Sequence, residues 1–142
     1  MGTPLMHAEN SVKKYGGCID DYLEIHSTMD SSGSGMGDKR HRAATHNTWF
    51  INEILPLIFS AYIINSAGKM VGVVQIGKDH ILEDFGDKFI PTLSDWLMNL
   101  EWASWMDNGN GYPPSAQKTE NIIERGKLKE WEDRVINYVA ID

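Results

Sequence analysis

The chain has 142 residues, a formal net charge of −7, 42% hydrophobic residues and one cysteine, Cys18. This length suits one ordinary domain with its own core, and the hydrophobic content argues against extensive disorder. The negative charge disfavours general binding to nucleic acid, the lone thiol gives no disulfide that would indicate secretion, and no segment resembles a signal peptide or a membrane span, so we expect a cytoplasmic protein.

Two helices are expected near the N-terminus. Thr3 and Pro4 supply a hydroxyl cap and a first-turn proline, which predict a helix that runs until Gly16. Two aspartates then suit the start of a second helix over residues 22–29. The serine- and glycine-rich segment 31–37 is predicted to be a loop, either a plain connector or a lid beside a site.

A long helix and a hairpin are expected in the middle of the chain. Asp38 would cap a helix over residues 39–59, with Pro56 kinking it or ending its regular part. Residues 61–65 and 69–76 have the composition of two short strands, and the Ser-Ala-Gly turn between them predicts a β-hairpin.

Three further helices are expected after the hairpin. The first covers residues 78–85, and the second begins at Pro91 or Thr92. The glycine- and proline-rich segment 108–114 then breaks the chain before a polar helix over residues 116–139.

These elements predict an α+β fold, a mainly helical single domain with a two-stranded hairpin at about 61–76. Residues 1–111 would form the helical domain with the hairpin. Residues 112–142 would form a C-terminal helix that packs on the body or mediates assembly, including assembly of identical subunits.

Histidines and carboxylates recur together at helical spacing in three segments. His26 and Asp30 are four residues apart, and so are His80 and Asp84, whereas His46 and Glu53 are seven apart in the predicted helix 39–59. Residues at these spacings share one face of a helix. Imidazole and carboxylate ligands suit a divalent metal, with zinc first and manganese or iron as alternatives. The expected ligands are His7, His26, His46, His80 and Asp84.

Catalysis by such a metal needs about three protein ligands and an open position for water. The metal lowers the pKa of that water, and Glu53 or Asp30 is expected to accept its proton or to serve as a further ligand. Arg40 and Arg42, at the start of a helix, are expected to hold a phosphate group of the substrate. The alternative, favoured for Arg40, is a solvated face with the arginines paired to Asp20, Asp21 or Asp38.

The resulting functional hypothesis is a metal-dependent hydrolase acting on a small phosphorylated or nucleotide-like substrate. One alternative is a structural zinc domain with four closed ligands. Another is a non-catalytic phage accessory protein that binds a host protein or sequesters a ligand, in which the histidines would be structural. Neither membrane binding nor general nucleic-acid binding is expected.

Several short motifs follow one another between residues 7 and 97. They are Asp21-Tyr22, Ile25-His26, Asp30, Arg40-His41-Arg42, His46, Asn65-Ser66, Gly68, His80, Glu83-Asp84 and the run from Pro91 to Leu97. In this order they resemble a family of small uncharacterised proteins found in bacteria and their phages, with no established activity. The resemblance implies an intracellular protein, in the host cytoplasm if it is phage-encoded, and directs attention to His7, His26, His46 and His80.

Overall fold

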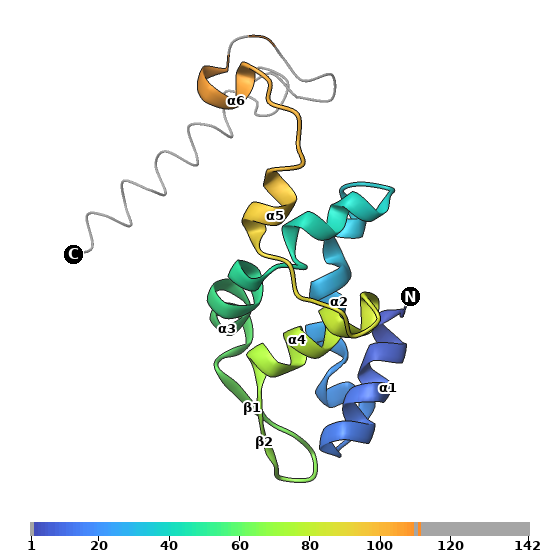
Figure 1. The fold of residues 1–142 in the computed structure, drawn as a ribbon. Coiled ribbons are helices and arrows are strands. Elements are labelled where there is room, and N and C mark those ends of the chain that lie inside the picture. Colours follow the sequence, from blue (N-terminus) through green and yellow to red (C-terminus); the bar gives the residue numbers. More distant parts are fainter. Residues whose placement is uncertain (1, 110, 112–142) are drawn as a thin grey trace, which may run out of the picture. The chain divides into compact units, whose positions relative to one another are not determined.

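The computed structural model describes residues 2–109 and 111 of the chain. The chain divides into two compact units, Met1–Leu100 and Glu101–Asp142. The first is a set of helices with one two-stranded antiparallel sheet (Figure 1), which confirms the α+β, mainly helical fold class. In the second, the described residues form the short helix α6 (Trp105–Asn108). The predicted helix 116–139 lies outside the described residues, so its role in packing or assembly stays a prediction.

The N-terminal helix α1 (Pro4–Tyr15) forms as predicted. The Thr3 hydroxyl accepts a hydrogen bond from the backbone N–H of Met6 at 3.2 Å, and proline occupies the first turn. The helix ends at Gly16, whose φ of 82° is readily adopted only by a residue without a Cβ atom.

The second helix, α2 (Leu23–Asp30), lies within one residue of its predicted bounds and packs against α1. It follows the short 3-10 helix η1 (Ile19–Asp21). The serine- and glycine-rich segment after it is only partly a loop, because its first half forms the 3-10 helix η2 (Ser31–Ser34).

The predicted helix over residues 39–59 is wrong. The segment forms the 3-10 helix η3 (Lys39–Ala44), the π-helix η4 (Phe50–Ile54) and the α-helix α3 (Leu55–Phe59). Asn47 causes the break, because its side chain donates to the carbonyl of residue 43 and accepts from the backbone N–H of residue 50, both at 2.8 Å. An asparagine bonded in this way ends one helix and caps the next.

The break also removes the basis for pairing His46 with Glu53. The two residues were expected two turns apart on one helix, but His46 lies in the turn before the π-helix and Glu53 is exposed on it. A π-helical turn is rare and is often found near functional sites.

The hairpin is confirmed, although its second strand is shorter than predicted. Strands β1 (Tyr62–Ile64) and β2 (Met70–Gly72) are antiparallel, and Ile63 lies opposite Val71. The predicted strand to residue 76 is wrong, because α4 (Val73–Asp84) begins directly after the hairpin. The β-branched run favours a strand locally, but Val73, Ile76 and Ile81 are buried at helical spacing against the core.

Helix α4 is the centre of the first unit (Figure 1) and packs against α1, α2, α3 and η4. It approaches η4 closely at Gly77, where a Cβ atom would lie 2.8 Å from Cγ2 of Ile51. After it comes α5 (Leu93–Leu97), whose start is confirmed by reciprocal hydrogen bonds between Thr92 and Asp95. The buried apolar core consists of Ala8, Tyr22, Ile25, Met29, Ile51, Leu55, Val71, Val73, Ile76 and Ile81. Within the described part of the chain, no helix has both the length and the apolar character needed to traverse a bilayer.

Candidate metal centre

The segments that carry the expected ligands meet at the central helix α4. Helix α1 contributes His7, α2 contributes His26 and Asp30, and α4 contributes His80 and Asp84 four residues apart, so each pair lies on one helix face. His46 comes from the turn between η3 and η4, and the indole N–H of Trp96 fixes its backbone by donating to the His46 carbonyl at 2.9 Å. The four histidine side chains are fully or almost fully buried.

Two histidines and two aspartates form a cluster whose ligand atoms are directed at one point. One nitrogen each from His46 and His80 and one oxygen each from Asp30 and Asp84 all lie within 4.8 Å of one another. Nε2 of His46 is 2.8 Å from Oδ2 of Asp84, and Nε2 of His80 is 3.1 Å from Oδ1 of Asp30. The Asp84 side chain is 1% exposed, whereas that of Asp30 is 25% exposed, so solvent reaches the group at Asp30.

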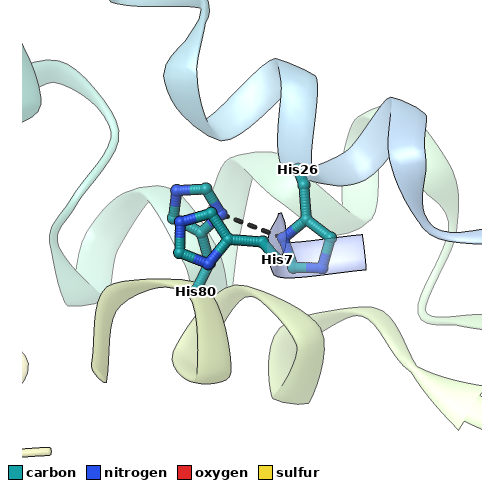
Figure 2. A group of neighbouring side chains, drawn as sticks. All are labelled: His7, His26 and His80. Atoms are coloured by element: carbon teal, nitrogen blue, oxygen red, sulfur yellow. Dashed lines mark hydrogen bonds between the residues drawn. The ribbon is translucent and has the colours of Figure 1, made fainter. Parts of the chain in front are cut away.

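A second group, His7, His26 and His80, is equally close but has the wrong ring orientation for an ion (Figure 2). The His7 and His80 rings are stacked with centroids 3.8 Å apart and planes 28° apart. His26 instead meets His80 edge to edge, with ring planes 22° apart and the two Nδ1 atoms only 2.9 Å apart, which leaves no room for an ion between them. The lone pair of an imidazole nitrogen lies in the ring plane, so stacked rings direct their lone pairs side by side. The His46 ring instead stands at 75° to His80, which allows their lone pairs to converge.

His46 has hydrogen-bond partners that favour a metal over a neutral, metal-free state. The Thr45 hydroxyl donates its one proton to the Met29 carbonyl at 2.6 Å, so in its 2.9 Å contact with Nδ1 of His46 it must accept. A neutral His46 then carries its proton on Nδ1 and presents a lone pair on Nε2 to the Asp84 carboxylate. Two acceptors 2.8 Å apart require a cation between them, either a second ring proton or a metal ion.

His7 contacts the other oxygen of Asp84 and does not converge with the four ligand atoms. Its Nε2 lies 3.2 Å from Oδ1 of Asp84, and its Nδ1, 3.5 Å from Oε2 of Glu83, is buried without a hydrogen-bond partner. The geometry therefore gives His7 the role of orienting Asp84. His26 contacts His80 and none of the carboxylates, so it too lies behind the ligand atoms.

The two arginines predicted to hold a phosphate group lie in different surroundings. Arg42 is 11% exposed, lies over the Phe85 ring and places Nη2 3.6 Å from Oδ1 of Asp84, so it reaches the cluster. Arg40 is exposed and pairs with Asp38, whose pKa its guanidinium lowers to about 2, as the surface alternative anticipated. Glu53 is not among the residues whose ligand atoms converge.

Sequence reasoning did not single out Ser11, which bonds His26, or Thr45, which bonds His46. Ser11 follows His7 by four residues on α1, and this helical spacing was an available signal. Thr45 immediately precedes His46 in a turn, a position that no periodicity reveals.

Burial and the neighbouring charges shift the pKa values in opposite directions. Burial lowers the pKa of His26 to about 3, helped by the nearby His80 and His7, and burial also lowers that of His46. Burial would lower the pKa of His7 as well, but Asp84 and Glu83 outweigh it and raise the value to about 9. Burial would raise the pKa of Asp84, but hydrogen bonds from His46, His7 and His80 bring it well below its usual range.

These shifts predict how the stability of the metal-free protein depends on pH. Between pH 6.5 and about 3 the unfolded chain binds a proton at His26 that the folded chain does not, so stability falls as the pH drops below 6.5. His7 has the opposite sign, because its raised pKa stabilises the fold below pH 6.5 and this contribution is lost as the pH rises through about 9.

Urea unfolding in the presence of a chelator should therefore show maximum stability near neutral pH. His26→Leu should flatten the acid side of the profile, and His7→Gln should flatten the alkaline side. An acid slope unchanged in His26→Leu would contradict the buried, neutral state of His26.

The model of the family described as Domain of unknown function (DUF6915) matches residues 2–106. The chain belongs to this family. The matched range contains every residue of the cluster. It confirms the resemblance to a family of uncharacterised proteins with no established activity, whereas the bacterial or phage origin stays a prediction. No curated protein and no solved structure matches the chain.

Proposed function

We propose that this protein is a divalent-metal-dependent hydrolase of a small phosphorylated or nucleotide-like substrate. The observation that carries the proposal is the convergence of Asp30, His46, His80 and Asp84, which come from three parts of the chain. Burying such groups is costly unless each is paired or bound to a metal. Two imidazoles and two carboxylates suit zinc, manganese or iron.

Two features favour a catalytic metal site over a structural zinc site with a closed set of ligands. Structural zinc sites are built mainly from cysteines in a closed set of four, whereas Cys18 is exposed and belongs to neither histidine group. His46, His80 and Asp84 would hold the ion as three protein ligands, and the partly exposed Asp30 would leave water access to it and supply a carboxylate for the proton of that water.

Features beside the cluster support the substrate class. The Arg42 guanidinium, 3.6 Å from Asp84, would contact a phosphate oxygen of a substrate bound at the ion. The Phe85 ring beneath it also lines a groove of about 230 Å³ formed by Phe85, Phe89, Pro91, Asp95 and Trp96. An almost wholly apolar groove beside a guanidinium suits a ligand with a planar apolar part and an anionic part.

Elemental analysis and hydrolysis assays test the proposal together. We expect a near-stoichiometric divalent metal in the purified protein, and metal-dependent release of phosphate from p-nitrophenyl phosphate or from a panel of nucleotides. His46→Ala should lower metal content and reduce turnover by more than about 100-fold, because even an outer partner of a metal ligand is worth about 10–100-fold.

His41→Ala is the matched control, since His41 bonds Ser32 and belongs to neither histidine group. It should leave metal content and turnover unchanged. Metal without turnover on any of these substrates would favour the structural or ligand-sequestering alternative. Absence of metal after reconstitution would favour a protein that acts by binding a partner.

A further inference from the structure

A chain of buried hydrogen bonds leads from the candidate metal centre to α1. Nδ1 of His80, on the side of the ring away from the carboxylates, lies 2.9 Å from Nδ1 of His26, and Figure 2 shows this contact as a dashed line. Nε2 of His26 lies 2.8 Å from the hydroxyl oxygen of Ser11. All three residues are at most 3% exposed, so bulk water does not replace these contacts.

We propose that Ser11 and His26 are positioning residues that hold the ring proton of His80 on Nδ1 and so leave its Nε2 lone pair free for the metal ion. The proposal rests on the metal centre of the proposed function. It does not depend on which substrate is hydrolysed.

The direction of the hydrogen bonds follows from proton counting. With the ion on Nε2, the one proton of a neutral His80 is on Nδ1 and donates to Nδ1 of His26. His26 then carries its own proton on Nε2 and donates it to the Ser11 oxygen. In the reverse direction a neutral His80 carries its proton on Nε2, where it donates to Asp30 and occupies the position of the ion.

The orientation of His80 is fixed by the same neighbours. Stacking against His7, with ring centroids 3.8 Å apart, restrains the plane of the His80 ring. Of the two ring flips about the Cβ–Cγ bond that keep this plane, the bond to His26 selects the one that directs Nδ1 toward His26. His46 is held similarly, since its Nδ1 bonds Thr45. Each ligating histidine thus has an outer partner on Nδ1, the arrangement that sets tautomer and orientation in metal sites.

The chain of hydrogen bonds ends at Ser11, which also lines a cavity at the surface. Ser11 lines a cavity of about 280 Å³ between α1 and α4, together with Asn10, Lys14, Asp79, Leu82, Glu83 and Asp87. When Ser11 accepts from His26, its own proton is free to be donated elsewhere. The tautomer of the histidine pair therefore links the ion to the hydroxyl at this cavity.

Nitrogen-15 NMR of the histidine rings in the zinc-loaded full chain tests the proton positions directly. We expect His80 to carry its proton on Nδ1 and His26 to carry its proton on Nε2. A zinc-loaded protein in which the His26 proton is on Nδ1 would overturn the proposal. This measurement uses the wild-type protein and does not depend on a variant that folds.

Zinc affinity of Ser11 variants supplies the second test. Ser11→Ala should weaken zinc binding by about 10-fold or more, and Ser11→Thr, which retains a hydroxyl, should recover most of the loss. Asn10→Ala is the matched control, because Asn10 lines the same cavity but bonds Glu83 and not His26. Equal zinc affinity in Ser11→Ala and wild type would overturn the proposal.

The outcomes separate this inference from the proposed function. A wild-type protein that binds zinc with the expected tautomers but hydrolyses none of the substrates contradicts the hydrolase proposal alone. Normal hydrolysis and zinc affinity in Ser11→Ala contradict the positioning role alone. A wild-type protein that binds no divalent metal contradicts both.

Discussion

Replacing Asp84 with alanine should destabilise the metal-free protein by about 3–5 kcal/mol, the range observed when one partner of a buried ion pair is removed. The Asp84 carboxylate is 1% exposed and contacts His7, His46 and His80. It also lies 3.6 Å from the Arg42 guanidinium. Asp84 is the main buried counter-charge for two groups, the His7 ring, which its raised pKa keeps protonated at neutral pH, and the Arg42 guanidinium. The substitution removes that counter-charge from both.

Urea unfolding at neutral pH in a chelator measures this effect, with Asp38→Ala as the matched control. Asp38 is also paired with an arginine, but both side chains are exposed, so its removal should cost little beyond the lost N-cap bond from the Arg40 backbone N–H and should lower the unfolding midpoint far less than Asp84→Ala. A midpoint for Asp84→Ala close to that of Asp38→Ala would contradict the buried, multiply bonded state of Asp84. The same variant should also lose most of its zinc affinity, because a candidate ligand is gone.

Gly77→Val should destabilise the fold by about 2–3 kcal/mol, toward the upper end of the usual cost of overpacking. A Cβ atom at Gly77 would lie 2.8 Å from Cγ2 of Ile51 and 2.9 Å from Cδ2 of Leu55, and both residues are fully buried. The removal of a helical glycine gains less than about 1 kcal/mol, so the steric cost is larger. The substitution should push α4 away from η4.

This displacement has a functional consequence, because α4 carries His80 and Asp84 while His46 precedes η4. Zinc affinity should therefore fall together with the unfolding midpoint. Gly37→Val is the control, since a Cβ atom at Gly37 meets nothing within 4 Å. A Gly77→Val protein as stable as wild type would contradict the close packing of α4 on η4.

Local signals in the sequence were reliable where the chain makes its own contacts. The Thr3 hydroxyl and Pro4 start α1, Gly16 ends it, and Thr92 caps α5, all through bonds within a few residues. The hairpin turn at Gly68, with a φ of 83°, belongs to the same group. Such contacts depend on short-range geometry, which spacing and residue type reveal.

Two segments depart from the structure that their hydrophobic pattern predicts, one because of tertiary packing and one because of a local side-chain bond. The run after Gly72 is rich in β-branched residues, but it forms a helix because its apolar side chains are buried on one helical face. The segment around His46 leaves the predicted helix because Asn47 bonds both flanking backbones. Each choice depends on what the segment packs against or bonds, which hydrophobic periodicity does not report.

By itself, the sequence determined an α+β, mainly helical chain and the pairing of His26 with Asp30 and of His80 with Asp84 on two helix faces. Only the tertiary structure decided which of these side chains meet, because convergence depends on how α1, α2 and α4 pack around one another. It separated the converging atoms of His46, His80, Asp30 and Asp84 from the stacked rings of His7 and His26, since ring orientation is set by neighbours far away in the chain. It also left Glu53 and Arg40 outside the cluster, which helical spacing alone could not decide.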